Sequence, residues 1–201
     1  MDKQKHVYEK TGERYLEQIM AMPWDRLETT YGLDTRDRMI RVPFFRSLVH
    51  INKNGFFFAT GEKTPFDVCV IAARYVLMCP ETLPAGKELS AFRDFKGSGP
   101  LTVFYADNVE VKIRKNIHDP VRNLKHACLE LGGYRPDASI SRDLVMTFDA
   151  LPHLPVYLLY DFADEEFPSS CSVLFESRAQ TMLDPESLAI IGAVLAQKLV
   201  A

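Results

Sequence analysis

The residues with the clearest capacity for chemistry are four carboxylates near the end of the chain, Asp161, Asp164, Glu165 and Glu166. They follow an apolar run typical of a buried strand, so we expect them on the turn that leaves this strand. Several converging carboxylate oxygens can bind a divalent cation. The alternative is a solvated acidic turn that keeps two strands from pairing with other chains. The cluster has no calcium-loop spacing and no histidine, which favours the solvated turn.

His153 is the histidine closest in sequence to these carboxylates, between Pro152 and Pro155. A histidine beside a carboxylate can act as a general base. Arg93 is a candidate anion partner for such a site. Together these residues define a hypothetical catalytic pocket around His153, Asp161 and the 164–166 turn. The alternative is an exposed turn histidine, which the flanking prolines favour.

Motifs of established chemistry are missing from the sequence. No two histidines have the helical spacing of a zinc pair, and the cysteines form no C-x-x-C pair: Cys69, Cys79, Cys128 and Cys171. We therefore expect no metal site, no iron–sulfur cluster and no other cofactor. Nucleophile-elbow, dinucleotide, Walker and kinase motifs are also missing. The glycine-rich segment 97–100 ends in Pro100, which lacks the amide of a phosphate cradle, so we expect a flexible connection.

A basic run near the middle of the chain is the remaining charged feature: Lys112, Arg114, Lys115, His118, Arg122, Lys125 and His126. Such density can contact phosphate. No stacking aromatics interleave with these residues, and part of the run falls on the outer face of an amphipathic helix, which favours a solvated face. The net charge of -3 and pI near 6.0 predict no nucleic-acid and no membrane partner.

Length and composition bound the architecture. A chain of 201 residues with 47% hydrophobic residues is long enough for one full core. The most apolar run, 68–79, is shorter than the roughly 20 residues of a membrane span, so it predicts a buried helix. The charged N-terminus does not resemble a signal peptide, and the unpaired cysteines indicate a cytoplasmic protein with reduced thiols. We expect a single domain, 1–201, with a helical region at 1–35 and an α+β body at 36–201.

Periodicity places the elements that position these residues. Helical spacing predicts helices over 4–21, 66–78 and 185–199, the second buried on most sides and the third opened by Asp184-Pro185. Alternation predicts a hairpin within 37–59 and strands at 143–148, 156–162 and 172–176. Thr64 is the expected N-cap of the second helix. Segment 101–117 fits either a strand or a helix. The order favours α+β, with a mixed or mainly antiparallel sheet against a buried central helix and a C-terminal helix.

Several segments resemble a prokaryotic family recorded as domain of unknown function 3786. The likeness rests on Gly86 with the run 88–94, on Leu-Pro and Leu-Pro-Val at 151–156, on Asp-Glu-Glu-Phe-Pro at 164–168, on Leu-Phe-Glu at 174–176, and on the helix opening at 183–189. The resemblance implies occurrence in anaerobes, where some members are fused to an iron–sulfur domain like those of corrinoid methyl-transfer proteins. The scattered cysteines depart from those members, and the family supplies no catalytic residues to carry over.

Three functional hypotheses follow. The first is a non-catalytic accessory or binding domain beside a redox or methyl-transfer protein, in anaerobic redox or one-carbon metabolism. The second is an enzyme of unrecognised type with a pocket near His153 and the 164–166 turn. The third is a structural subunit that is held in an assembly by an apolar face. Such an assembly could also be a homo-oligomer. We further expect Phe167 to tuck inward and fix the geometry of the acidic turn.

Overall fold

The fold is α+β, as predicted, in a computed structural model that describes residues 2–117, 119–137 and 140–201. His118 of the basic run lies outside the described residues. In chain order the elements are α1 (Asp2–Ala21), α2 (Asp25–Tyr31), η1 (Arg36–Arg38), β1 (Ile40–Phe44), β2 (Ser47–Asn52), β3 (Gly55–Phe58), α3 (Phe66–Leu77), β4 (Leu89–Ala91), η2 (Phe92–Asp94), η3 (Gly99–Leu101), α4 (Thr102–Tyr105), the π-helical turn η4 (Ala106–Val111), α5 (Lys112–Asn116), α6 (Pro120–Glu130), β5 (Leu144–Leu151), β6 (Leu154–Asp161), β7 (Ser170–Glu176), α7 (Ala179–Met182) and α8 (Pro185–Leu199).

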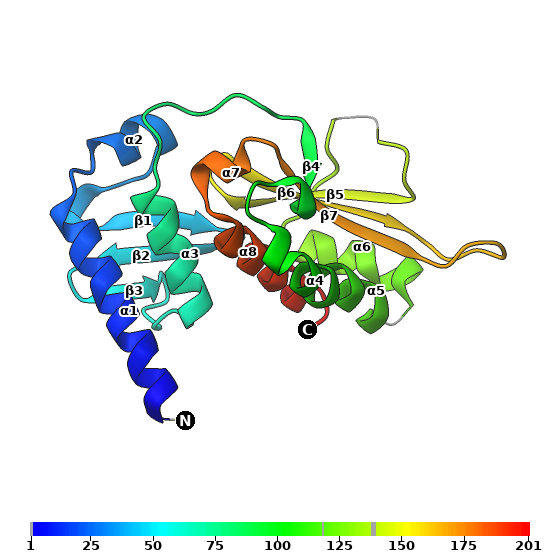
Figure 1. The fold of residues 1–201 in the computed structure, drawn as a ribbon, viewed down its shortest axis with the longest axis horizontal. Helices are drawn as coiled ribbons and strands as arrows, with labels where there is room; N and C mark the ends of the chain where they lie inside the picture. The colour runs from blue at the N-terminus through cyan, green and yellow to red at the C-terminus, as the bar shows by residue number, and fades with distance from the viewer. Residues whose placement is uncertain (1, 118, 138–139) are drawn as a thin grey trace.

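The strands form two antiparallel sheets rather than one. The first has the order β1-β2-β3 and the second the order β4-β7-β6-β5. Figure 1 shows the first sheet beside α1 and α3, and the second beside α4, α5, α6 and α8. None of the helices in the described part of the chain is long and apolar enough to cross a membrane.

The predicted hairpin within 37–59 contains an additional chain reversal. The turn at 52–55 is present, but β1 and β2 are separate strands joined at Phe45 and Arg46. Neither residue is a usual turn former, which is why the sequence pattern did not reveal the turn. Phe45 adopts a φ of 50°, its amide donates to the Ala150 carbonyl at 3.0 Å, and its ring packs edge-on against Phe44. Tertiary contacts therefore hold this turn.

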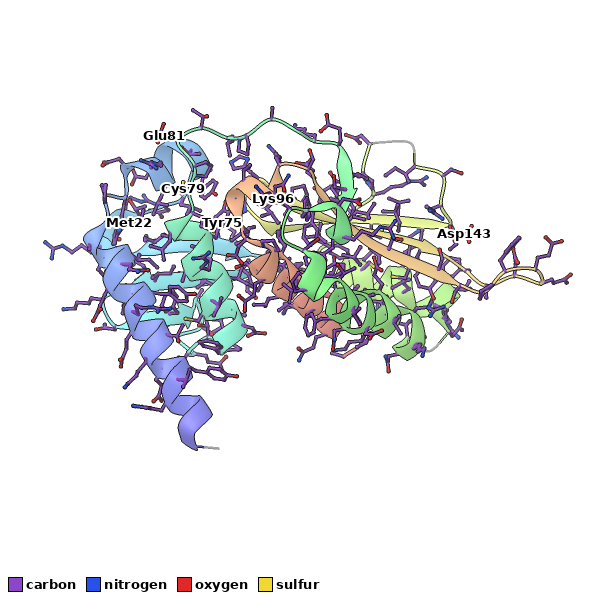
Figure 2. The ribbon with its side chains drawn as sticks, viewed as in Figure 1. Met22, Tyr75, Cys79, Glu81, Lys96 and Asp143 are labelled. Atoms are coloured by element: carbon purple, nitrogen blue, oxygen red, sulfur yellow. The ribbon has the colours of Figure 1, made fainter. Side chains whose placement is uncertain are left out.

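Helix α3 begins without the predicted side-chain cap. Pro65 occupies the N-cap position, and the Thr64 hydroxyl instead contacts the Phe56 carbonyl at 3.4 Å. At its other end, the helix joins the half of the molecule that contains the β1-β2-β3 sheet to the half that contains the β4-β7-β6-β5 sheet. The Tyr75 hydroxyl donates to the Pro152 carbonyl at 2.6 Å, and its ring stacks on Tyr31 at 4.1 Å. Figure 2 shows Tyr75 at this boundary.

Segment 101–117, which fits two periods in sequence, is helical throughout most of its length as α4, η4 and α5. Val109 and Ile113 are both fully buried, at the i, i+4 spacing of one helical face. Val111 is only half-buried. The alternation at 109, 111 and 113 resembles a strand only because the aliphatic Val111 lies in sequence between the two core-facing residues Val109 and Ile113.

Helix α8 is the most enclosed helix of the second half. Its N-terminus is fixed by Asp184, whose carboxylate accepts from the Ser187 amide at 2.9 Å and from Arg74 Nε at 2.8 Å. Arg74 belongs to α3, so this pair also joins the two halves. Burial raises the pKa of Asp184, but the hydrogen bonds from Ser187 and Arg74 outweigh it and hold the pKa below its usual range.

Tyr105 packs at very short range against Gly192 in the middle of α8. A Cβ atom on Gly192 would lie 2.6 Å from a ring carbon of Tyr105, closer than any side chain permits. Tyr105 is buried, donates its hydroxyl to the Val173 carbonyl of β7 at 3.0 Å, and stacks on Phe92 at 4.3 Å. Gly192 is therefore needed for α8 to approach the sheet through this ring.

We predict that Leu195→Ala lowers the free energy of unfolding by about 2–5 kcal/mol, because Leu195 is fully buried on α8. Val70 is the matched control. The sequence predicts it to be buried, but the structure leaves it half-buried, so Val70→Ala should cost less. Urea denaturation of the two variants measures both values. Equal losses would contradict the assigned difference in burial.

We predict that Gly192→Ala destabilises the fold by about 1–3 kcal/mol, because the added methyl group must displace the Tyr105 ring. The double variant Gly192→Ala/Tyr105→Leu should lose less than the sum of the two single variants, since the smaller side chain removes the clash. Additive losses in a double-mutant cycle would show that the two residues do not interact.

We predict a pH dependence from Asp184. Its folded-state pKa lies below the unfolded value of about 3.9, so its stabilising contribution is complete above that value and is lost as the pH falls through the folded-state pKa. The parent chain should therefore lose stability more steeply than Asp184→Asn between about pH 5 and pH 2. Parallel slopes in urea titrations across this range would count against the assignment.

Candidate functional site

The structure separates the residues of the hypothetical catalytic pocket. His153 is the second residue of the two-residue turn between β5 and β6, with a φ of 60°, and Asp161 is the last residue of β6. A strand rises about 3.3 Å per residue, so the two lie more than about 20 Å apart. His153 is exposed and stacks at 6.5 Å on the Tyr31 ring. It lies at the boundary of the two halves, far from the acidic turn.

The acidic turn forms the tip of the β6–β7 hairpin, which projects beyond the helices in Figure 1. Asp164 Oδ1 accepts from the amides of Glu166 and Phe167 at 2.9 and 2.7 Å, and these bonds lower the pKa of Asp164. Glu165 and Glu166 are exposed. The prediction that Phe167 tucks inward is wrong, since 66% of this residue is exposed. The tip extends past the helical layer, so no core lies within reach of the ring.

Asp161 and Arg93 each have other partners. Asp161 accepts from Ser170 at 2.8 Å and pairs with Arg142. Burial raises its pKa, but these bonds outweigh it and lower the pKa overall. Arg93 is largely exposed and lies 3.9 Å from Asp94. Neither residue pairs with Glu165 or Glu166 in the described chain, and no group of three or more metal-ligating side chains occurs there.

A different polar group lies on the sheet face turned away from α8. Strand register places the side chains of Thr147, Tyr157 and Leu174 on one face, because these residues are direct cross-strand partners. We call this surface the open face. Its members are Val145, Thr147 and Asp149 of β5, Pro155, Tyr157, Leu159 and Asp161 of β6, Ser172, Leu174 and Glu176 of β7, Leu89 and Ala91 of β4, and Tyr134, which bridges to Thr147.

The described helices leave the open face uncovered. In Figure 1, α4, α5, α6 and α8 lie on the opposite side of the sheet. Leu159 is 7% exposed yet is not part of the main core cluster, as expected for a side chain on the other face. Leu89 and Leu174 are half-buried beside it. The open face thus carries aliphatic surface that is only partly covered by its own polar neighbours.

A buried ion pair crosses one end of the open face. Arg178 Nε donates to Glu176 Oε2 at 2.5 Å, and the two side chains are only 11% and 7% exposed. The Tyr157 hydroxyl donates to the other Glu176 oxygen at 3.3 Å. Burial, followed by the Glu176 charge, raises the pKa of Tyr157, so this hydroxyl keeps its proton. A buried pair needs such additional hydrogen bonds to offset the loss of hydration.

A second tyrosine–carboxylate contact lies nearby. The Tyr134 hydroxyl donates to Asp149 Oδ1 at 3.0 Å. Burial, with the hydrogen bond to Asp149, raises the pKa of Tyr134 to about 12. Between the two tyrosines lies Thr147, which is 2% exposed and whose hydroxyl has no hydrogen-bond partner in the described chain. An unpaired buried hydroxyl costs about 1–3 kcal/mol, which the packing around Thr147 has to offset.

Two of the segments that carry the family resemblance lie side by side next to this group. The Arg178 amide donates to the Gly86 carbonyl at 3.0 Å, and the Ser177 amide donates to the Glu88 carbonyl at 2.8 Å. Gly86 has a φ of 105°, and a Cβ atom there would lie 2.6 Å from the Ser177 hydroxyl. The start of the 88–94 run is therefore packed directly against the end of the Leu-Phe-Glu strand, next to the Glu176–Arg178 pair.

Sequence reasoning missed the open face for a definite reason. Tyr134, Asp149, Tyr157 and Glu176 lie in four separate segments, and only strand pairing brings them together. Alternation in β5 and β6 does indicate two faces, yet it does not indicate which face a helix covers. The one usable signal was that each of three buried-type strands carries a polar residue, Asp149, Tyr157 or Glu176, on the face opposite its most buried side chains.

The comparisons with known proteins agree with the resemblance seen in sequence. No curated protein and no solved structure matches the chain. The family model described as "Domain of unknown function (DUF3786)" matches residues 25–198, which include the open face but not α1. The protein therefore belongs to the DUF3786 family.

Proposed function

We propose that this protein is a non-catalytic binding domain that docks a partner protein on the open face of its four-stranded sheet. The observation that carries the proposal is a sheet face that no described helix covers and that presents partly exposed aliphatic and tyrosine side chains. An uncovered sheet face with such composition resembles a recognition surface more than a solvated one.

Packing supports a protein partner. Leu174 and Leu89 are half-buried on a face that no described helix covers, and a partner that buries them gains roughly 25 cal/mol for each Å² of apolar area removed from water. Tyr134 is 45% exposed and Tyr157 half-buried. Tyrosine is enriched at interfaces because it combines a large apolar ring with a polar tip.

The charges on the open face indicate which kind of partner segment would be complementary to it. The Glu176–Arg178 pair is neutral overall, whereas Asp149 forms no ion pair in the described chain. A partner segment with apolar side chains and a cation opposite Asp149 would match these features. Both tyrosines keep their protons, so they suit hydrogen bonding better than proton abstraction.

The identity of the partner is proposed from the resemblance alone. It implies a redox or methyl-transfer protein of anaerobic one-carbon metabolism as the partner class, with the present chain supplying recognition and no cofactor. The acidic hairpin tip is the competing docking element, because it also presents an exposed aromatic ring, Phe167, beside carboxylates.

We predict that Leu174→Lys and Asp149→Asn abolish partner binding and leave the chain folded. The first places a charge on the aliphatic surface, and the second removes the carboxylate charge while an amide oxygen still accepts from Tyr134. The measurement is anaerobic co-purification from the native host, followed by cross-linking and hydrogen exchange of the recovered complex. Protection should appear on β5, β6 and β7.

The matched control is Glu165→Gln/Glu166→Gln at the hairpin tip. It should change stability by no more than about 0.5 kcal/mol and keep the partner, because both side chains are exposed. Loss of the partner in this control, with retention in Leu174→Lys, would transfer the docking site from the open face to the tip.

A further inference from the structure

A second candidate site lies in the other half of the molecule, where α1 packs against β3 and α3. A cavity of about 570 Å³ opens between these elements, lined by Tyr8, Glu9, Gly12, Glu13, Leu16, Asn54, Gly55, Phe56, Lys63, Thr64, Phe66 and Cys69. Figure 1 shows α1 running beside these elements. The volume falls within the range of sites that hold small molecules. It shares no residue with the open face.

The cavity has an apolar floor and a charged rim. Phe56 and Cys69 are 4% and 7% exposed, and Leu16 is half-buried. The rings of Tyr8 and Phe66 stack face to face at 4.0 Å with an interplanar angle of 13°, and this aromatic pair forms one wall of the cavity. Glu9, Glu13 and Lys63 are exposed at the rim. A site that combines an aromatic wall with a few charged groups at one edge is suited to a flat, amphipathic ligand.

Gly12 is the feature that packing does not explain. Glycine inside a helix weakens it relative to alanine, so a structural reason is expected. Its sequence position on the inner stripe suggests a close backbone contact. The structure shows none, because an added Cβ atom would lie 3.7 Å from the Cys69 sulfur, an ordinary contact. The missing side chain at Gly12 therefore enlarges the cavity and serves no close approach of the backbone.

Cys69 belongs to the floor and is not a reactive group. Burial raises the pKa of its thiol to about 11, and the nearby Lys63 charge only partly opposes this. The thiol is therefore protonated at neutral pH and contributes a small, polarisable apolar surface. A ligand in the cavity would contact this sulfur without covalent chemistry.

The charged side chains at the rim favour a cationic ligand. Glu9 and Glu13 are four residues apart on α1, a spacing at which like charges repel, and neither forms an ion pair in the described chain. Lys63 is the single cation among the lining residues. The lining thus has a net negative charge, which a bound cation facing Glu9 and Glu13 would reduce.

We propose that this cavity binds a small planar aromatic compound that carries a cationic group. The aromatic part lies against the Tyr8–Phe66 wall and above the Cys69 floor, and the cation faces Glu9 and Glu13. The wall contributed by α1 lies outside the family match, which begins at residue 25. The site is thus built where the N-terminal helix packs on the body of the family.

The test uses tryptamine, indole and indole-3-propionate, which share one ring and differ in charge. Binding to the full chain is measured by saturation-transfer NMR and calorimetry. Tryptamine should bind, indole more weakly, and indole-3-propionate at least about tenfold more weakly than tryptamine. No tryptamine binding at about 1 mM, or a preference for the acid, overturns the proposal.

Three variants locate the binding. Gly12→Leu should fill the cavity and abolish binding with a melting temperature that does not fall, because leucine favours the helix over glycine. Gly12→Ala, which adds a single methyl group, should retain binding. Glu9→Gln/Glu13→Gln should bind tryptamine and indole equally. Unchanged tryptamine affinity in a folded Gly12→Leu variant would place the ligand elsewhere and overturn the assignment.

Discussion

The close contact between Tyr105 and Gly192 is the constraint on which the second half of the fold depends. The Tyr105 ring fills the space between α8 and β7, and its hydroxyl reaches the Val173 carbonyl at 3.0 Å. A side chain at position 192 would separate the helix from the sheet and open a void that costs stability. Because Tyr105 is the last residue of α4, the same contact fixes where η4 and α5 begin. The face of the four-stranded sheet that is turned toward α8 therefore lies entirely in the core.

The burial of this face explains why the other face of the sheet is available for recognition. An antiparallel sheet with one face in the core ordinarily turns polar residues toward water. Here the outer face retains Leu89, Leu159 and Leu174, and its two tyrosines, Tyr134 and Tyr157, are hydrogen-bonded to carboxylates. A face of this kind is neither a second core nor a typical solvated surface. The Glu176–Arg178 pair is largely buried and hydrogen-bonded to Tyr157, which holds these side chains in the defined geometry that a recognition surface requires.

Local sequence signals predicted the elements well and their assembly poorly. Asp184-Pro185 and the stripe through Leu195 correctly predicted α8, because a cap and a helical period are encoded within a few residues. The turn at Phe45 could not be found, since contacts with Ala150 and Phe44 hold it. Phe167 was misjudged because its exposure depends on how far the hairpin extends beyond the helices, a property of the whole fold.

The candidate site shows the same limit in another form. His153 and Asp161 are eight residues apart, a separation that a turn would close and a strand holds open. Conversely, Tyr134 and Asp149 are fifteen residues apart and share a hydrogen bond because β5 folds back beside the segment that precedes it. Sequence distance therefore carries little information about a site until the strand register is known.

The two proposed sites divide the chain along the boundary of the family match. The open face lies within residues 25–198, next to two of the segments from which the resemblance was recognised, whereas one wall of the cavity is α1, outside that range. A surface built only from the matched body can be a property of the family fold. A cavity that needs an additional helix depends on that helix packing against α3, through the Tyr8–Phe66 stack and the space left at Gly12. The physical origin of each site thus predicts that recognition at the open face and ligand binding under α1 vary independently.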